Sequence, residues 1–299
     1  MIVFAHLQRT IDLRVIACVE QEANIMAIPK RRLGRTNLMV TELGLGAMDT
    51  PHSAEGRETL NTALDLGINI IDTAREYEGS EYLIGNVIRE RKAKGFFAAT
   101  KTFSRTRDGS QTEVDKSLKI LGVDKIDIYQ LHDISTEDAW EQVMAEGGAL
   151  EGLQIARYRG LIDYIGISSH SIEVLEKAIT CGEFDTVMLE YSAFYRDTER
   201  LLPIAKENDV GVIAMRPLGG SGRMSSIRAR VSEGNTSLTP RMLLRYVLSN
   251  PDISTAIPGT RFPSRVRENV ESASSYQPLN EAEKRDCEEQ ARLLYQERV

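Results

Sequence analysis

The chain has 299 residues, of which 41% are hydrophobic, 27% are charged and 6% are aromatic. This composition excludes a disordered chain and supplies enough apolar residues for a large buried core. The formal net charge of -7 excludes the basic excess that is typical of nucleic-acid binding, so we expect no nucleic-acid partner.

The three cysteines, Cys18, Cys181 and Cys287, are widely separated and form no C-x-x-C pair. They indicate reduced thiols rather than a disulfide framework. No run approaches the ~20 consecutive apolar residues of a membrane span. Polar residues between Gln8 and Arg14 interrupt the apolar start of the chain before a signal-peptide core forms. We therefore expect a cytoplasmic protein with no membrane partner.

Residues 1–25 differ in character from the residues that follow. We expect translation to start at Met26, which would make residues 1–25 an extension outside the native product and residues 26–299 the folded domain. An ordinary N-terminal helix over Ile11–Glu22 is the alternative. After Met26, two short β-like segments flank the turn residues Gly34–Asn37, which predicts an N-terminal β-hairpin from Lys30–Leu33 and Leu38–Val40.

From residue 40 onward, short apolar runs rich in β-branched residues alternate with longer segments of helical periodicity. Each run is nearly continuously apolar, as expected for parallel strands buried on both faces. This alternation predicts one α/β domain, a (β/α)8 TIM barrel. The predicted strands are Thr41–Ala47, Ile68–Asp72, Phe96–Lys101, Ile126–Leu131, Tyr164–Ser168, Thr186–Glu190, Val210–Met215 and Thr255–Pro258.

The segments between these runs place apolar residues at three- and four-residue spacing, as outer helices do. The clearest examples are Glu55–Leu66, Glu81–Arg91, Gln111–Leu121 and Ile172–Thr180. A last helix is predicted over Asn280–Arg298, because Asn280 followed by Glu283 has the spacing of a capping box.

Polar residues at the carboxyl ends of the strands are candidates for catalysis, because barrel active sites form there. Asp72 ends the second strand, Lys101 ends the third and His132 follows the fourth, while Tyr77 lies in the loop after Asp72. Asp72 is the natural counter-ion for Lys101 at a buried strand end. The lysine charge is expected to lower the pKa of Tyr77 from its ordinary value of about 10, which makes the phenol a better proton donor.

With His132 orienting a carbonyl oxygen, these groups form a general-acid site for carbonyl reduction. No side chain supplies a hydride, so a nicotinamide cofactor is implied. A phosphate site is expected after the eighth strand, where Arg261 and Arg265 add positive charge at the start of a predicted helix. The preceding glycine-rich loop, residues 216–222, permits close approach of the backbone to a pyrophosphate.

From about Arg31 to Ala291, the sequence resembles the aldo-keto reductases. The resemblance rests on Ile71-Asp72-Thr73-Ala74 followed by Tyr77, Ser80-Glu81 and Ile84-Gly85, and on Ala99-Thr100-Lys101, Tyr129-Gln130-Leu131-His132, Tyr164-Ile165-Gly166-Ile167-Ser168 and Ile257-Pro258-Gly259-Thr260-Arg261. It implies a barrel that transfers hydride from NADPH to an aldehyde or ketone, or the reverse alcohol oxidation. It also implies a catalytic tetrad of Asp72, Tyr77, Lys101 and His132.

The resemblance further implies a set of contacts to NADPH (NADP+). These are Gly46, Met48, Asp72, Ser168, Ser169, Met188, Met215, Arg216, Leu218, Gly220, Gly259, Thr260, Arg261, Arg265 and Asn269. Arg261 and Arg265 are the residues expected to favour NADPH over NADH. Three positions depart from the family pattern: Ser169 replaces an asparagine, Met188 a glutamine and Met215 an aromatic residue. A methionine can still pack against the nicotinamide ring.

Two other functions compete with a reductase of small carbonyl substrates. The first is an NADPH-binding regulatory or sensor protein of the same fold with little turnover. The second is a metal-dependent hydrolase that uses Asp72, His132 and Glu190 as ligands. Lys101 argues against the hydrolase, because its charge would repel a metal ion in the same barrel mouth. We expect no metal.

Overall fold

The computed structural model describes residues 27–92, 95–220 and 238–296. The proposed extension, residues 1–25, lies outside this range. Eight parallel strands pair in chain order, and two parallel bridges, Leu43 to Ala256 and Gly46 to Gly259, join the first strand to the last. The strands are β3 (Leu45–Gly46), β4 (Ile70–Asp72), β5 (Phe97–Thr102), β6 (Ile126–Leu131), β7 (Ile162–Ser168), β8 (Thr186–Glu190), β9 (Gly211–Met215) and β10 (Thr255–Ile257). The predicted (β/α)8 barrel is confirmed.

The first barrel strand is shorter than the predicted Thr41–Ala47 because its two ends have other roles. Thr41 pairs with Lys30 in the N-terminal hairpin, and Ala47 begins a short 3-10 helix, η2 (Ala47–Asp49). Between them, Glu42 accepts a 2.8 Å hydrogen bond from Arg31 and a 2.7 Å bond from the Tyr276 hydroxyl. The single run predicted from the sequence therefore spans the end of one strand, a connecting turn and a second strand, Leu45–Gly46.

The predicted hairpin closes the amino-terminal end of the barrel. It consists of β1 (Lys30–Arg32) and β2 (Met39–Thr41), which are antiparallel and joined through the 3-10 helix η1 (Gly34–Thr36). Gly34 has a φ of 49°, and a Cβ there would lie 2.1 Å from the backbone nitrogen of Gly211. A side chain at this position would therefore separate the hairpin from the barrel.

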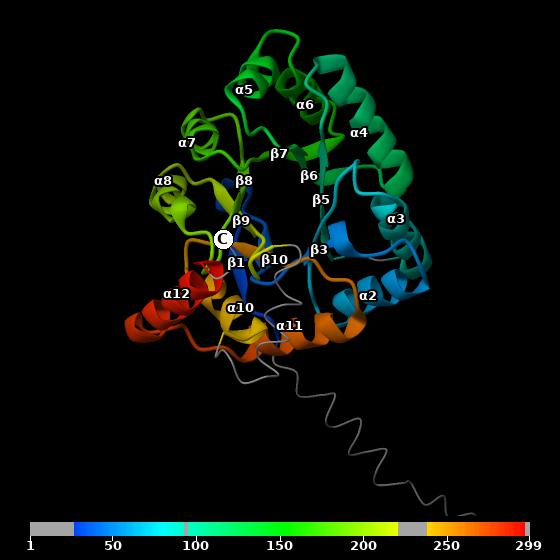
Figure 1. The fold of residues 1–299 in the computed structure, drawn as a ribbon. Helices are drawn as coiled ribbons and strands as arrows, with labels where there is room; N and C mark the ends of the chain where they lie inside the picture. Colours follow the sequence, from blue (N-terminus) through cyan, green and yellow to red (C-terminus); the bar gives the residue numbers. More distant parts are fainter. Residues whose placement is uncertain (1–26, 93–94, 221–237, 297–299) are drawn as a thin grey trace, which may run out of the picture.

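Helices surround the strands, as Figure 1 shows. They are α2 (Ala54–Asp65), α3 (Ser80–Arg91), α4 (Arg107–Leu121), α5 (Glu137–Met144), α6 (Ala149–Tyr158), α7 (Ile172–Thr180), α8 (Leu202–Glu207) after η3 (Asp197–Leu201), α10 (Pro240–Leu248), α11 (Pro263–Ser275) and α12 (Glu281–Gln296). The predicted capping box of α12 is confirmed, because Asn280 and Glu283 exchange side-chain to backbone hydrogen bonds of 2.9 and 3.0 Å.

Apolar side chains fill the barrel interior and the layer between strands and helices. The interior cluster contains Leu33 and Val40 from the hairpin region, with Ile70, Ala99, Ile128, Met188, Ile213 and Ile257 above them. Asp72, Lys101 and His132 lie toward the carboxyl ends of the strands, where the cavity opens. Within the described part of the chain, no helix is long and apolar enough to cross a membrane.

Candidate active site

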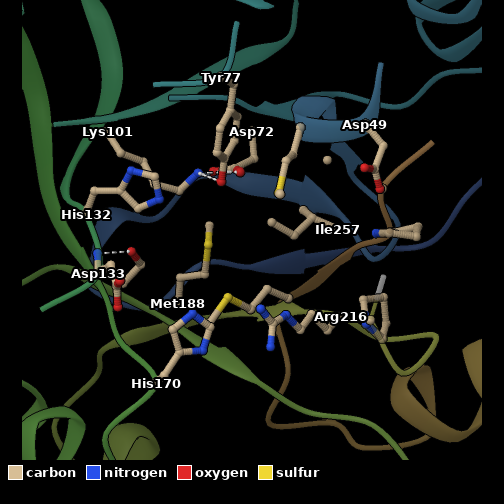
Figure 2. A pocket seen from close by; sticks show the side chains of 18 of the residues that line it. Asp49, Asp72, Tyr77, Lys101, His132, Asp133, His170, Met188, Arg216 and Ile257 are labelled. Carbon is tan, nitrogen blue, oxygen red and sulfur yellow. Dashed lines mark hydrogen bonds and ion pairs between the residues drawn. The ribbon is translucent and has the colours of Figure 1, made fainter. Parts of the chain in front are cut away.

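A cavity of about 500 Å³ opens at the carboxyl ends of the strands. Figure 2 shows Tyr77, Lys101 and His132 on one side of it, with Met188, Arg216 and Ile257 across from them. Asp72 also lines this cavity. Parallel barrel strands place their carboxyl ends at one face, and this is why residues far apart in the sequence meet here. The four predicted catalytic side chains are brought together, while their roles stay a prediction.

Lys101 and Asp72 form a buried ion pair between β5 and β4. Lys101 Nζ lies 2.6 Å from Asp72 Oδ2 and donates a 2.8 Å hydrogen bond to the carbonyl of Thr73. Gln130 from β6 donates a 3.2 Å bond to the other carboxylate oxygen, Asp72 Oδ1. Burial raises the pKa of Asp72 and lowers that of Lys101, and the contact between them opposes both shifts. The pair is held from three strands.

The Tyr77 hydroxyl lies 3.4 Å from Lys101 Nζ. Burial raises the pKa of Tyr77 above its ordinary value, and the negative charges of Asp72, Glu76 and Asp49 raise it further. The expected lowering of the pKa is therefore wrong for this cavity, because burial and the three carboxylates outweigh the opposing positive charge of Arg216. The phenol therefore keeps its proton and is a weaker acid than an exposed tyrosine.

His132 follows β6 and completes the wall beside Tyr77. Its ring meets that of Tyr77 edge-on at 5.6 Å between centroids and stacks on Phe103 at 4.2 Å. Its Nδ1 lies 3.1 Å from Glu76 Oε2. Aromatic contacts on two sides and a carboxylate on the third fix the orientation of the ring.

Glu81, at the start of α3, ties the loop that carries Tyr77 to strand β5. This buried carboxylate accepts a 2.8 Å bond from the Thr100 hydroxyl on β5 and a 2.5 Å bond from Arg75. Arg75 also donates a 2.7 Å bond to Glu113 on α4. Further along α3, a Cβ on Gly85 would lie 2.3 Å from the carbonyl oxygen of Ile120, so this glycine permits close packing of α3 on α4. Glu81 therefore positions the loop, and Gly85 allows the close packing of α3 that follows it.

A model of the aldo/keto reductase family matches residues 42–235. The chain belongs to this family of oxidoreductases. It is 28% identical over 287 residues to an uncharacterized oxidoreductase, YqkF, of Bacillus subtilis, covering 82% of this chain and 91% of that protein. It is 31% identical over 217 residues to the aldo-keto reductase yakc [NADP(+)] of Schizosaccharomyces pombe, covering 65% of this chain and 62% of that one. The holo form of an aldo-keto reductase from Bacillus halodurans superposes with a TM-score of 0.75 at 25% identity, covering 88% of this chain and 96% of that chain.

Most of the predicted cofactor residues of this aldo/keto reductase line the same cavity. They are Gly46, Met48, Asp72, Ser168, Met188, Met215, Arg216, Leu218, Gly220 and Gly259. The departures Met188 and Met215 pack in one apolar cluster with Ile257, and all three line the cavity. Figure 2 shows Met188 and Ile257 across the cavity from Tyr77. The predicted glycine-rich loop is described only to Gly220, and its remainder lies outside the described residues.

Five predicted cofactor residues, Ser169, Thr260, Arg261, Arg265 and Asn269, do not line the cavity. The Ser169 hydroxyl donates to the carbonyl of Ser171 at 3.3 Å and accepts from its N–H at 3.0 Å, so it closes a turn before α7. The Thr260 hydroxyl donates to the Pro258 carbonyl at 3.1 Å. Arg265 pairs with Glu268 at 2.8 Å on the exposed side of α11. Ser169 therefore lies before α7, whereas the other four residues lie just before or within α11.

Residues that the sequence did not single out also line the cavity, among them Glu76, Asp133 and His170. The position of Glu76 next to Tyr77 in the motif is a signal that could have found it. His170 is exposed, and its Nδ1 lies 2.5 Å from Glu190 Oε1, which also accepts a 2.7 Å bond from Arg216. Glu190 thus joins two cavity residues.

The interpretation of Asp72, His132 and Glu190 as metal ligands is wrong. Over the described ranges, no three His, Cys, Asp or Glu side chains are grouped so that they could hold a metal ion. Asp72 faces Lys101, whereas Glu190 faces His170 and Arg216.

Proposed function

We propose that this chain reduces an aldehyde or ketone with NADPH as hydride donor, and catalyses the reverse alcohol oxidation when supplied with NADP+. The observation that carries the proposal is the meeting of the Tyr77 hydroxyl, the Lys101 ammonium and the His132 ring on one wall of the cavity. A proton donor beside a fixed cation is what the conversion of a carbonyl into an alcohol requires once hydride has been added.

The residues present fit a nicotinamide dinucleotide. Met188 and Met215 give the cavity an apolar side on which a flat ring can pack, and Arg216 adds a cation at its edge. Beyond the cavity, α11 begins with Pro263 and has no side-chain N-cap, so its first N–H groups and helix dipole favour a phosphate. The bound cofactor supplies the hydride. The relative from Schizosaccharomyces pombe named for NADP(+) supports the choice of a phosphorylated dinucleotide.

Tyr77 is the proton donor in this proposal. The phenol is protonated at neutral pH, so a proton is available as negative charge develops on the substrate oxygen. Lys101, held by Asp72, lies 3.4 Å from the phenol oxygen and stabilises the phenolate that remains after the transfer. The nearby cation therefore favours the transfer, whereas burial opposes it by raising the pKa of Tyr77.

His132 holds the substrate oxygen toward Tyr77. The ring lies edge-on to the phenol, and Phe103 and Glu76 fix its orientation. A hydrogen bond from an oriented group adds to transition-state stabilisation as charge develops on the oxygen. Tyr77 and His132 act on the carbonyl oxygen alone, so we infer no particular aldehyde or ketone from them.

The test is to mix the purified chain with NADPH and a panel of aldehydes and ketones while following the absorbance of the reduced nicotinamide. We expect NADPH oxidation that depends on both the protein and the carbonyl. Tight binding of NADPH without turnover of any carbonyl would contradict the proposal and favour the regulatory or sensor function.

A further inference from the structure

Glu76 precedes the proposed acid Tyr77 and contacts two other residues on the same wall of the site. Its Oε2 lies 3.1 Å from Nδ1 of His132, and its Oε1 accepts a 3.1 Å bond from the backbone N–H of Phe103. The Phe103 ring in turn stacks on the His132 ring. One carboxylate thus holds both the histidine and the residue that covers it.

These contacts determine where the imidazole carries its proton. Burial raises the pKa of Glu76, but hydrogen bonds from His132 and the Phe103 backbone lower it more, so the side chain is a carboxylate at neutral pH. A carboxylate accepts hydrogen bonds and donates none, so Nδ1 of His132 must carry the hydrogen. In a neutral ring the other nitrogen, Nε2, then has a lone pair and no hydrogen.

We propose that Glu76 is a positioning residue that keeps the proton of His132 on Nδ1 and presents Nε2 to the substrate. The inference rests on the proposed reductase function. A neutral His132 then accepts a hydrogen bond from a hydroxyl but cannot donate one to a carbonyl oxygen. Only the imidazolium carries hydrogens on both nitrogens, so carbonyl reduction uses the charged ring and alcohol binding uses the neutral one.

Several other charged groups lie near the His132 ring, but their hydrogen bonds are with other partners. Lys101 on β5 is paired with Asp72 on β4. Arg105 donates hydrogen bonds to the backbone carbonyls of His132 and Asp133, at 3.0 and 3.1 Å. Tyr77 is neutral. Glu76 is therefore the carboxylate that contacts the ring directly.

The first measurement is the tautomer of His132 in the free protein, read from long-range nitrogen–proton NMR spectra of protein labelled at its histidine nitrogens. The chain has four histidines, and a His132→Gln variant assigns the signal. At a pH where the ring is neutral, we expect hydrogen on Nδ1 in the wild type. In Glu76→Ala we expect the hydrogen to move largely to Nε2. Hydrogen on Nε2 in the wild type would overturn the inference.

The second measurement is the pH dependence of carbonyl reduction. Where the ring loses its charge, the wild-type rate should fall by about tenfold per pH unit, because one required proton is lost. In Glu76→Ala the rate should stay nearly constant over that interval, because a neutral ring with hydrogen on Nε2 still donates. In Glu76→Gln the amide oxygen keeps the bond from the Phe103 N–H, which turns the amide NH2 toward Nδ1, so this variant should behave like Glu76→Ala. Glu78→Ala removes an exposed carboxylate from the same loop and should follow the wild type.

Equal pH profiles in the wild type and Glu76→Ala would overturn the inference. The tautomer is measured without cofactor or substrate, so its result does not depend on turnover. If the hydrogen is on Nδ1 but the protein reduces no carbonyl, only the proposed function is contradicted. If the protein reduces carbonyls but the hydrogen is on Nε2, only the role of Glu76 is contradicted.

Discussion

The ammonium of Lys101 lies 2.6 Å from the carboxylate of Asp72, and both side chains are almost completely buried, with 1% and 4% of their surfaces exposed. A buried ion pair gains little net stability, because removing both charges from water offsets their attraction. Its geometry is nevertheless what places a cation 3.4 Å from the Tyr77 hydroxyl. The pair therefore belongs to the chemistry of the site more than to the stability of the barrel.

Breaking this pair from one side should be more damaging than removing both charges. Lys101→Met leaves the Asp72 carboxylate buried with only the Gln130 amide beside it, and we expect a loss of ~3–5 kcal/mol in the free energy of unfolding. The double variant Asp72→Asn, Lys101→Met should lose less, because no uncompensated charge remains. Urea unfolding followed by circular dichroism compares the three proteins. A double variant as unstable as the single one would show that packing, not charge, dominates here.

The raised pKa of Tyr77 has a direct spectroscopic consequence. A raised value keeps the phenol protonated as the pH rises, so Tyr77 should contribute no phenolate absorbance below pH ~10, the ordinary value for tyrosine. Titrations of the wild type and of Tyr77→Phe should therefore coincide up to that pH and separate only above it. A phenolate signal that disappears in Tyr77→Phe and has its midpoint below pH ~9 would mean that Lys101 controls the titration after all.

Cofactor choice is predicted to depend on the arginines near the start of α11. Arg261 and Arg265 are exposed, and Arg265 is held by Glu268 until another anion competes for it. Replacing both with alanine should weaken NADPH binding by roughly tenfold or more, because hydrogen bonds to charged groups contribute ~1.5–3 kcal/mol. NADH binding should change little. Arg267→Ala, in the same helix, is the control, and fluorescence titration measures all three proteins. An equal loss for both dinucleotides would contradict a role at the 2′-phosphate.

The parts of the fold and site that could be predicted depend on periodicity and on the ends of strands. Asp72 and Lys101 end predicted strands and His132 follows one, and parallel strands must bring such residues to one face. Asn280 and Glu283 predicted a cap because capping is a local interaction with fixed spacing. These features need no knowledge of side-chain contacts.

Other features depend on contacts that no spacing encodes. Glu76 reaches His132 only because the loop after β4 folds back over the end of β6. Ser169 lies where the family motif places a cofactor contact, yet its hydroxyl closes a turn with Ser171. The pKa of Tyr77 depends on burial and on three carboxylates together, so Lys101 alone predicted the wrong direction.

The central claim is that Tyr77 donates the proton in carbonyl reduction. Its most direct test is a single-turnover measurement of NADPH oxidation by a bound carbonyl substrate in the wild type and in Tyr77→Phe, with NADPH affinity measured in parallel. We predict that the variant binds NADPH as the wild type does and that its reduction rate falls by roughly 10²–10⁴-fold, the usual contribution of a general acid. Unchanged reduction in Tyr77→Phe would contradict the account.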